Sequence, residues 1–225
     1  ENSDDAGFAV LVHIGRGFIH VDQLRVPKHH AGNGQQLALT ARKRMGRALA
    51  ERGIAADEVT LFGLFMGLVA ALMLGFGLPG VLALVPLAIG RIADGLDGAV
   101  ARATQKSDFG GLLDIVCDFV FYAAIPLAFA LRDDGNALAA AFLLAAFYIN
   151  GASFLGYAIM AEKRGIETRA QGEKSLYYSA GLLEGTETIG FFVILCLWPA
   201  GFVPLAVIFG VLCLFTTAAR IALAR

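Results

Sequence analysis

Apolar residues dominate the chain from residue 61 onward, in six long stretches separated by short polar or glycine- and proline-containing segments. Each stretch has about 20 residues, the length that an α-helix needs to cross the hydrocarbon core of a bilayer. The pattern predicts an all-α fold, a polytopic membrane helix bundle with six transmembrane helices. The predicted spans cover residues 61–78, 80–102, 110–131, 137–161, 180–198 and 201–219.

The N-terminal part follows different patterns. In residues 35–56, apolar positions recur at helical spacing opposite a basic face, which predicts a cytoplasmic amphipathic helix before the first span. This helix either lies on the anionic inner leaflet or packs on the protein. Residues 1–34 are expected to form a cytoplasmic segment, either a short hairpin around residues 15–17 or the remnant of an upstream domain. Asp57 is a candidate N-cap for the first span, and residues 57–225 form the predicted transmembrane domain.

Composition and charge agree with a membrane protein. Of the 225 residues 57% are hydrophobic, whereas soluble domains contain about 45–50%. Eight of the 18 Lys and Arg residues precede the first span, and only Arg132 falls on the opposite side of the membrane. Because basic loops stay in the cytoplasm, we expect both termini and the active site on the cytoplasmic face of a bacterial inner membrane. We expect no nucleic-acid partner.

Four aspartates interrupt the second and third spans. Asp94 and Asp97 are spaced i, i+3, and Asp114 and Asp118 are spaced i, i+4, so each pair shares one helix face. A charge at membrane depth persists only where it is paired, binds a cation or lines a wet cavity. Two consecutive antiparallel helices would bring four carboxylates together without matching lysines. The pattern therefore predicts a site for Mg²⁺ or Mn²⁺, with two ions sharing the carboxylates.

Small residues and an arginine accompany these aspartates. Gly98 and Ala101 share the face of the first pair, and Gly110 lies one turn before the second, so a phosphorylated group can approach the backbone. Arg102, at the membrane surface, would hold a phosphate by a forked contact. Together these residues predict a diphosphate site. The alternative is that the aspartates are helix caps or partners of Arg91 and Arg102.

Residues 94–102 and 110–118 read D-x-x-D-G-x-x-A-R and G-x-x-x-D-x-x-x-D. This pattern resembles the signature of the CDP-alcohol phosphotransferases, also called CDP-alcohol phosphatidyltransferases, and the resemblance covers about residues 40–222. It implies a membrane enzyme of phospholipid biosynthesis. Such an enzyme transfers a substituted phosphate, commonly phosphatidyl, from a CDP-alcohol such as CDP-diacylglycerol to the hydroxyl of a second alcohol, and releases CMP. The loop before residue 110 is one residue shorter than is usual in the family.

The resemblance implies a role for each matching residue. Asp94, Asp97, Asp114 and Asp118 would bind two Mg²⁺ or Mn²⁺ ions, and Asp118 would also be the general base on the acceptor hydroxyl. The implied partners are a CDP-linked lipid donor, a small alcohol or alcohol-phosphate acceptor, membrane lipids and a second copy in a homodimer. The residues that would line the nucleotide are Gly98, Ala101, Arg102, Ser107, Gly110, Asp57 and Thr60.

The acceptor pocket has weaker support. Glu184 and Glu187 share a face of the fifth span and, with Tyr177, would suit an amino alcohol or a polyol. The alternative is a structural polar bridge inside the bundle or at a dimer interface. Lys163 and Arg220 lie on the cytoplasmic side and would suit a phosphorylated acceptor, although basic residues there also serve as anchors.

Two other classes of membrane protein use acidic clusters. Intramembrane prenyltransferases bind a diphosphate through Mg²⁺, but they have more spans and lack the glycine and arginine pattern of this chain. A cation transporter would use the four carboxylates as its ion site. Transport would be favoured by broken helices and an internal repeat, and no clear repeat is visible in the sequence.

Overall fold

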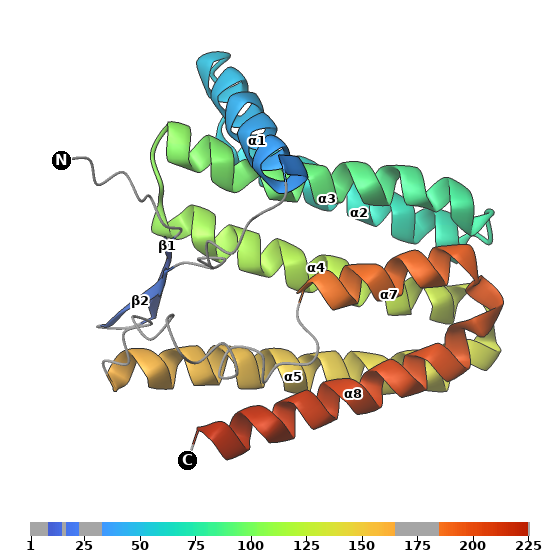
Figure 1. Cartoon of the computed structure of the whole chain (residues 1–225). Helices are drawn as coiled ribbons and strands as arrows, with labels where there is room; N and C mark the ends of the chain where they lie inside the picture. Colours follow the sequence, from blue (N-terminus) through green and yellow to red (C-terminus); the bar gives the residue numbers. More distant parts are fainter. Residues whose placement is uncertain (1–8, 15–16, 23–32, 165–184, 225) are drawn as a thin grey trace.

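Long helices running side by side make up most of the molecule, with α1 set at an angle across one end (Figure 1). The computed structural model describes residues 9–14, 17–22, 33–164 and 185–224. The helices are α1 (Asn33–Glu51), α2 (Ala56–Gly75), α3 (Gly80–Ala103), α4 (Asp108–Arg132), α5 (Ala137–Lys163), α7 (Gly185–Leu197) and α8 (Phe202–Leu223), with short 3₁₀ turns η1 (Asp134–Asn136) and η2 (Pro199–Gly201).

A short antiparallel hairpin precedes the helices. Strand β1 (Ala9–Ile14) pairs with β2 (Gly17–Asp22), with Ala9 opposite Asp22 and Ile14 opposite Gly17. The sequence predicted either a hairpin or the remnant of an upstream domain in this segment, and the structure has the hairpin. The described residues are therefore helical with one small β element. β1 lies beside α4 and β2 beside α5 (Figure 1).

Four described helical segments are long and apolar enough to cross a membrane, namely α2, α4, Asp134–Ala161 and Pro199–Leu223. Helix α3 has 24 residues, but Arg91, Asp94 and Asp97 interrupt its apolar run. Helix α7 has 13 residues, and the residues just before it lie outside the described part. The second and fifth of the six predicted spans therefore stay predictions.

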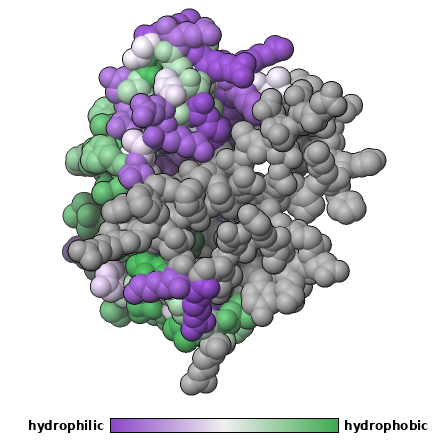
Figure 2. Space-filling view, turned by 90° about the vertical axis from the view of Figure 1, so that its left-hand side faces the viewer, coloured by the Kyte–Doolittle hydropathy of each residue, from purple (hydrophilic) through white to green (hydrophobic). Residues whose placement is uncertain are grey.

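The surface separates polar from apolar residues. Large apolar side chains are exposed along the bundle, among them Phe65 at 58% and Leu138 at 85%. Hydrophilic residues gather over α1 at the top of the end-on view, and hydrophobic residues follow the flank of the bundle (Figure 2). Exposed apolar flanks of this extent are expected where lipid, and not water, surrounds the helices.

Glycines bring α2 and α3 into close contact. A Cβ atom at Gly90 of α3 would lie only 2.8 Å from the carbonyl oxygen of Gly63 in α2. A larger residue at Gly90 would push the two backbones apart. The close packing matters for the site because Thr60 lies one turn before Gly63, on the same helix.

The start of α2 corrects one prediction. Asp57 is not the N-cap of this helix, because Ala55 occupies that position and its amide donates to Glu58 Oε2 at 3.0 Å. Asp57 instead lies in the first turn of α2. Its side chain comes close to Gly110 of α4, where a Cβ atom would lie 3.0 Å from Asp57 Oδ1.

At the other end of α2, the chain turns through Gly77, which has a φ of 77°, and Pro79. Arg132, at the end of α4, donates from Nη1 to the carbonyl oxygens of Leu74 at 3.1 Å and Leu78 at 3.4 Å. The basic residue that stands alone on its predicted side of the membrane thus links the end of α4 to the end of α2 and the turn that follows it.

Stacked phenylalanines hold α4, α7 and α8 together. Phe129 of α4 stacks on Phe202 of α8 with ring centroids 4.3 Å apart, and Phe191 of α7 stacks on Phe209 of α8 at 4.1 Å. Phe129 and Phe202 are fully buried. This packing fixes the C-terminal helices against the helix that carries Asp114 and Asp118.

We expect the Phe129→Ala variant to lose about 3–5 kcal/mol of stability, because it removes a buried ring and leaves a cavity. The measurement is the thermal unfolding midpoint of purified protein in detergent. The matched control is Phe76→Ala, since Phe76 is 80% exposed and should leave the midpoint close to that of the wild type. Equal midpoints for the two variants would contradict the packing described.

Candidate active site

Three aspartates from two helices converge. Asp94 and Asp97 of α3 and Asp114 of α4 each offer a carboxylate oxygen, and these three oxygens lie within 4.8 Å of one another. The sequence prediction that the two acidic faces meet is therefore confirmed for these residues. An all-oxygen, carboxylate set of this kind fits a hard divalent cation such as Mg²⁺ or Mn²⁺.

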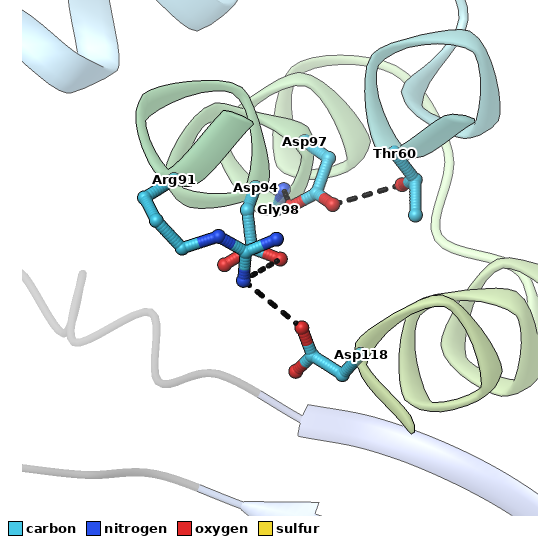
Figure 3. A network of polar contacts seen from close by, with 6 residues as sticks. All are labelled: Thr60, Arg91, Asp94, Asp97, Gly98 and Asp118. Carbon is cyan, nitrogen blue, oxygen red and sulfur yellow. Dashed lines mark hydrogen bonds and ion pairs between the residues drawn. The ribbon is translucent and has the colours of Figure 1, made fainter. Parts of the chain in front are cut away.

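Asp97 is buried and held by two donors (Figure 3). Thr60 Oγ1 of α2 donates to Asp97 Oδ2 at 2.8 Å, and the amide of Gly98 donates to Oδ1. Thr60 itself is buried, so this hydrogen bond is shielded from water. A carboxylate fixed in this way presents its remaining lone pairs in a set direction, which is how residues behind a metal ligand orient it.

Arg91 links the two acidic helices. Its Nη1 lies 3.1 Å from Asp118 Oδ1 and 3.5 Å from Asp94 Oδ1, and Figure 3 shows the side chain reaching between them. Its guanidinium also lies 4.3 Å from the ring centroid of Phe121. The alternative prediction, that aspartates pair with Arg91, is therefore confirmed for Asp94 and Asp118. These ion pairs exist together with the cluster of Asp94, Asp97 and Asp114.

This linking role was not assigned from the sequence, although one signal was available. Arg91 precedes Asp94 by three residues, so an ion pair on one helix face was predictable. Its contact with Asp118 depends on how α2, which packs against both α3 and α4, places these two helices relative to each other, and no local pattern predicts that.

Residues proposed to line a nucleotide lie on the last turns of α3, at the start of α4 and in the first turns of α2. Ser107 is the N-cap of α4, and its Oγ accepts from the amide of Gly110 at 2.9 Å. A Cβ atom at Gly110 would lie 3.0 Å from Asp57 Oδ1 and 3.1 Å from Ser107 Oγ, so a larger residue would require these side chains to shift by a few tenths of an ångström. Gly98, Ala101 and Arg102 are half-buried on the last turns of α3.

Three of the residues proposed for the acceptor lie in described helices. Arg220 of α8 donates to Asn150 Oδ1 at 3.1 Å and to Ser153 Oγ, both on α5. Glu187 is exposed in the first turn of α7, and Lys163 is exposed at the end of α5. Glu184 and Tyr177 lie outside the described residues. The acceptor pocket therefore stays a prediction.

We expect Thr60→Val to weaken Mn²⁺ binding by about 10- to 100-fold, because the change removes the hydrogen bond that orients Asp97 while keeping the side-chain volume. Isothermal titration of Mn²⁺ into protein in detergent measures this. Thr217→Val in α8 is the matched control, since that buried threonine lies on another helix and should leave the affinity unchanged. Wild-type affinity in the Thr60 variant would show that this bond does not orient a ligand.

Comparison with known proteins agrees with the geometry. The family model for CDP-alcohol phosphatidyltransferases matches residues 54–223, which include α2, α3 and α4. The inner membrane protein YnjF of Escherichia coli is 47% identical over 176 residues, covering 78% of this chain and 85% of the relative. The archaetidylinositol phosphate synthase of Pyrococcus horikoshii is 42% identical over 91 residues, covering 40% of this chain and 47% of that protein.

Among solved structures, the phosphatidylinositol phosphate synthase PgsA1 of Mycobacterium tuberculosis, determined with CDP-DAG bound, superposes with a TM-score of 0.58. The superposition covers 81% of this chain and 92% of that chain at 20% sequence identity, so it establishes the shared fold. The sequence signature, the apolar helices and the matched region lead to one conclusion: the chain is an integral membrane protein that belongs to the CDP-alcohol phosphatidyltransferase family.

Proposed function

We propose that this protein transfers a phosphatidyl or similar substituted phosphate group from a CDP-linked lipid to the hydroxyl of a second alcohol and releases CMP. The observation that carries the proposal is the convergence of Asp94, Asp97 and Asp114 from two helices inside the family-matched region. Family membership favours this transfer over the prenyltransferase and the cation transporter.

Asp94, Asp97 and Asp114 would hold the divalent cation or cations. A bound Mg²⁺ or Mn²⁺ would supply positive charge that neutralises the diphosphate and stabilises the departing CMP. The chain contributes the orientation of these ligands through Thr60, which fixes Asp97. Gly98 and Gly110 keep side-chain bulk away from the place where the diphosphate would lie.

Asp118 is the proposed general base. Its carboxylate takes the proton of the acceptor hydroxyl, and the hydroxyl oxygen forms a bond to the β-phosphorus. The bond from that phosphorus to the bridging oxygen breaks, and CMP leaves with the electron pair. Support for this role comes from the ion pair with Arg91, whose Nη1 lies 3.1 Å from Asp118 Oδ1 (Figure 3). Holding the base at a fixed place is a large part of its effect.

Two acceptor classes stay open. Two relatives are named for phosphorylated inositol products, which favours a polyol phosphate as acceptor. Arg220, which would suit such a phosphate, also donates hydrogen bonds to Asn150 and Ser153. These bonds support a structural role for Arg220 as a bridge between α5 and α8. An amino alcohol or a free polyol is the second class, through Glu187 in α7.

We also propose that both termini and the site face the cytoplasm and that the protein forms a homodimer.

The test is CMP release from CDP-diacylglycerol with Mg²⁺ or Mn²⁺ across a panel of polyol phosphates, polyols and amino alcohols. We expect Asp114→Asn to lose both Mn²⁺ binding and CMP release. Asp118→Asn should lose about 10²- to 10⁴-fold in turnover, because it removes the proposed base. As a further proposed metal ligand outside the cluster of three, Asp118 should affect Mn²⁺ binding less than Asp114 does. Asp134→Asn, exposed at the opposite end of the bundle, is the control.

Wild-type protein that releases no CMP with any acceptor in the panel would overturn the proposed function. If Asp118→Asn instead turned over at the wild-type rate, the transfer would stand and the role of Asp118 as base would be wrong.

For the Arg91→Met variant we expect the affinity for Mn²⁺ to rise and the turnover to fall. Arg91→Met removes a positive charge beside the carboxylates, so Mn²⁺ should bind several-fold more tightly. Turnover should fall by about 100-fold, because Asp118 loses the contact that positions it. Calorimetry and the CMP assay measure the two effects. Arg52→Met, an exposed arginine after α1, is the control. Weaker Mn²⁺ binding in Arg91→Met would contradict this positioning role.

A further inference from the structure

Helix α1 lies outside residues 54–223, the part that the family model matches, yet it packs directly on the site helix α3. Gly46 of α1 is buried at this contact, where a Cβ atom would lie 2.6 Å from Ala99 Cβ and 2.8 Å from the Ala99 carbonyl carbon. A larger residue would require the backbones to separate. The close approach therefore fixes which face of α1 is turned towards α3.

Arg42 lies one turn before Gly46 on that same face. Its guanidinium reaches the backbone of α3 at Gly95, where a Cβ atom would lie 3.6 Å from Nη2 and 3.7 Å from Cζ of the arginine. Gly95 lies two helical turns before Arg102, so the guanidinium of Arg42 lies over the face of α3 that also carries Arg102. The arginine is half-buried, unlike its neighbours Lys43 and Arg44, which are exposed.

The charge of Arg42 acts on two residues of the site, since it attracts Asp97 and repels Arg102. In the described part of the chain Arg42 forms no ion pair, and its Nε is buried without a hydrogen-bond partner. A buried donor without an acceptor is costly, and two guanidiniums close enough to repel each other are stabilised by an anion that both contact. Phosphate oxygens supply both the acceptors and the charge.

We infer that Arg42 is a further binding residue for the diphosphate of the CDP-linked donor and acts together with Arg102. The inference rests on the proposed function for the identity of the anion. It gives α1 a part in donor recognition, because Gly46 allows the helix to pack closely on α3 and Arg42 then lies over Gly95, on the face of α3 that carries Arg102. The phosphates of anionic lipids at the membrane surface are the other source of the same chemistry.

The experiment measures binding of CDP, with Mn²⁺ present, to the full chain in nonionic detergent, with and without added anionic lipid. We expect Arg42→Ala to weaken CDP binding by about tenfold or more, as the loss of a charge-assisted hydrogen bond does. Arg42→Lys should fall between this variant and the wild type, because lysine keeps the charge and loses the fork. Arg44→Ala, which removes the same charge from the exposed face of α1, should bind CDP like the wild type in both media.

Equal CDP affinity in the wild type and Arg42→Ala overturns the inference and leaves the proposed function intact. Equal weakening in Arg42→Ala and Arg44→Ala also overturns it, since the basic face would then act through the lipid surface. Wild-type protein that binds CDP with an Arg42-dependent affinity but releases no CMP supports the inference and overturns the proposed transfer. Wild-type protein that does not bind CDP overturns both.

Discussion

Carboxylates held within 4.8 Å of one another inside an apolar bundle are the constraint on which the rest of the structure depends. Their mutual repulsion is strong where little water screens it, so the protein must offset it wherever no cation is bound. Thr60 and the amide of Gly98 donate to Asp97, and Arg91 spans Asp94 and Asp118. The polar network is thus built around the acidic cluster, and the cation-binding chemistry follows from the same charges.

Small residues allow the helices that carry this network to pack closely. Gly63 and Gly90 let α2 and α3 approach until the Thr60 hydroxyl meets Asp97, and Gly46 lets α1 approach α3. At Gly110 a methyl group would contact the side chains of Asp57 and Ser107 closely. The rest of the bundle is held by a different means, the burial of aromatic rings such as Phe129 against Phe202. Close backbone contact therefore dominates near the site, and bulky packing dominates away from it.

Much of this arrangement could be predicted from local patterns. The i, i+3 and i, i+4 spacings place Asp94 with Asp97 and Asp114 with Asp118, because helical geometry alone decides which residues share a face. The helix ends were harder: Asp57 was expected to cap α2, but Glu58 accepts the Ala55 amide and Asp57 turns towards Gly110 instead. Competing polar residues within one turn offer several caps, and the tertiary environment selects among them.

The sequence by itself determined the membrane class, the family signature and the two acidic helix faces, since hydropathy and helical period are properties of each segment alone. Only the tertiary structure decided that Arg91 reaches Asp118, that Thr60 holds Asp97, and that Arg42 extends over Gly95. These contacts join residues on different helices. They depend on the distance and angle at which backbones pack, and close contacts at Gly63, Gly90 and Gly46 set that distance for α2 and α1 on α3.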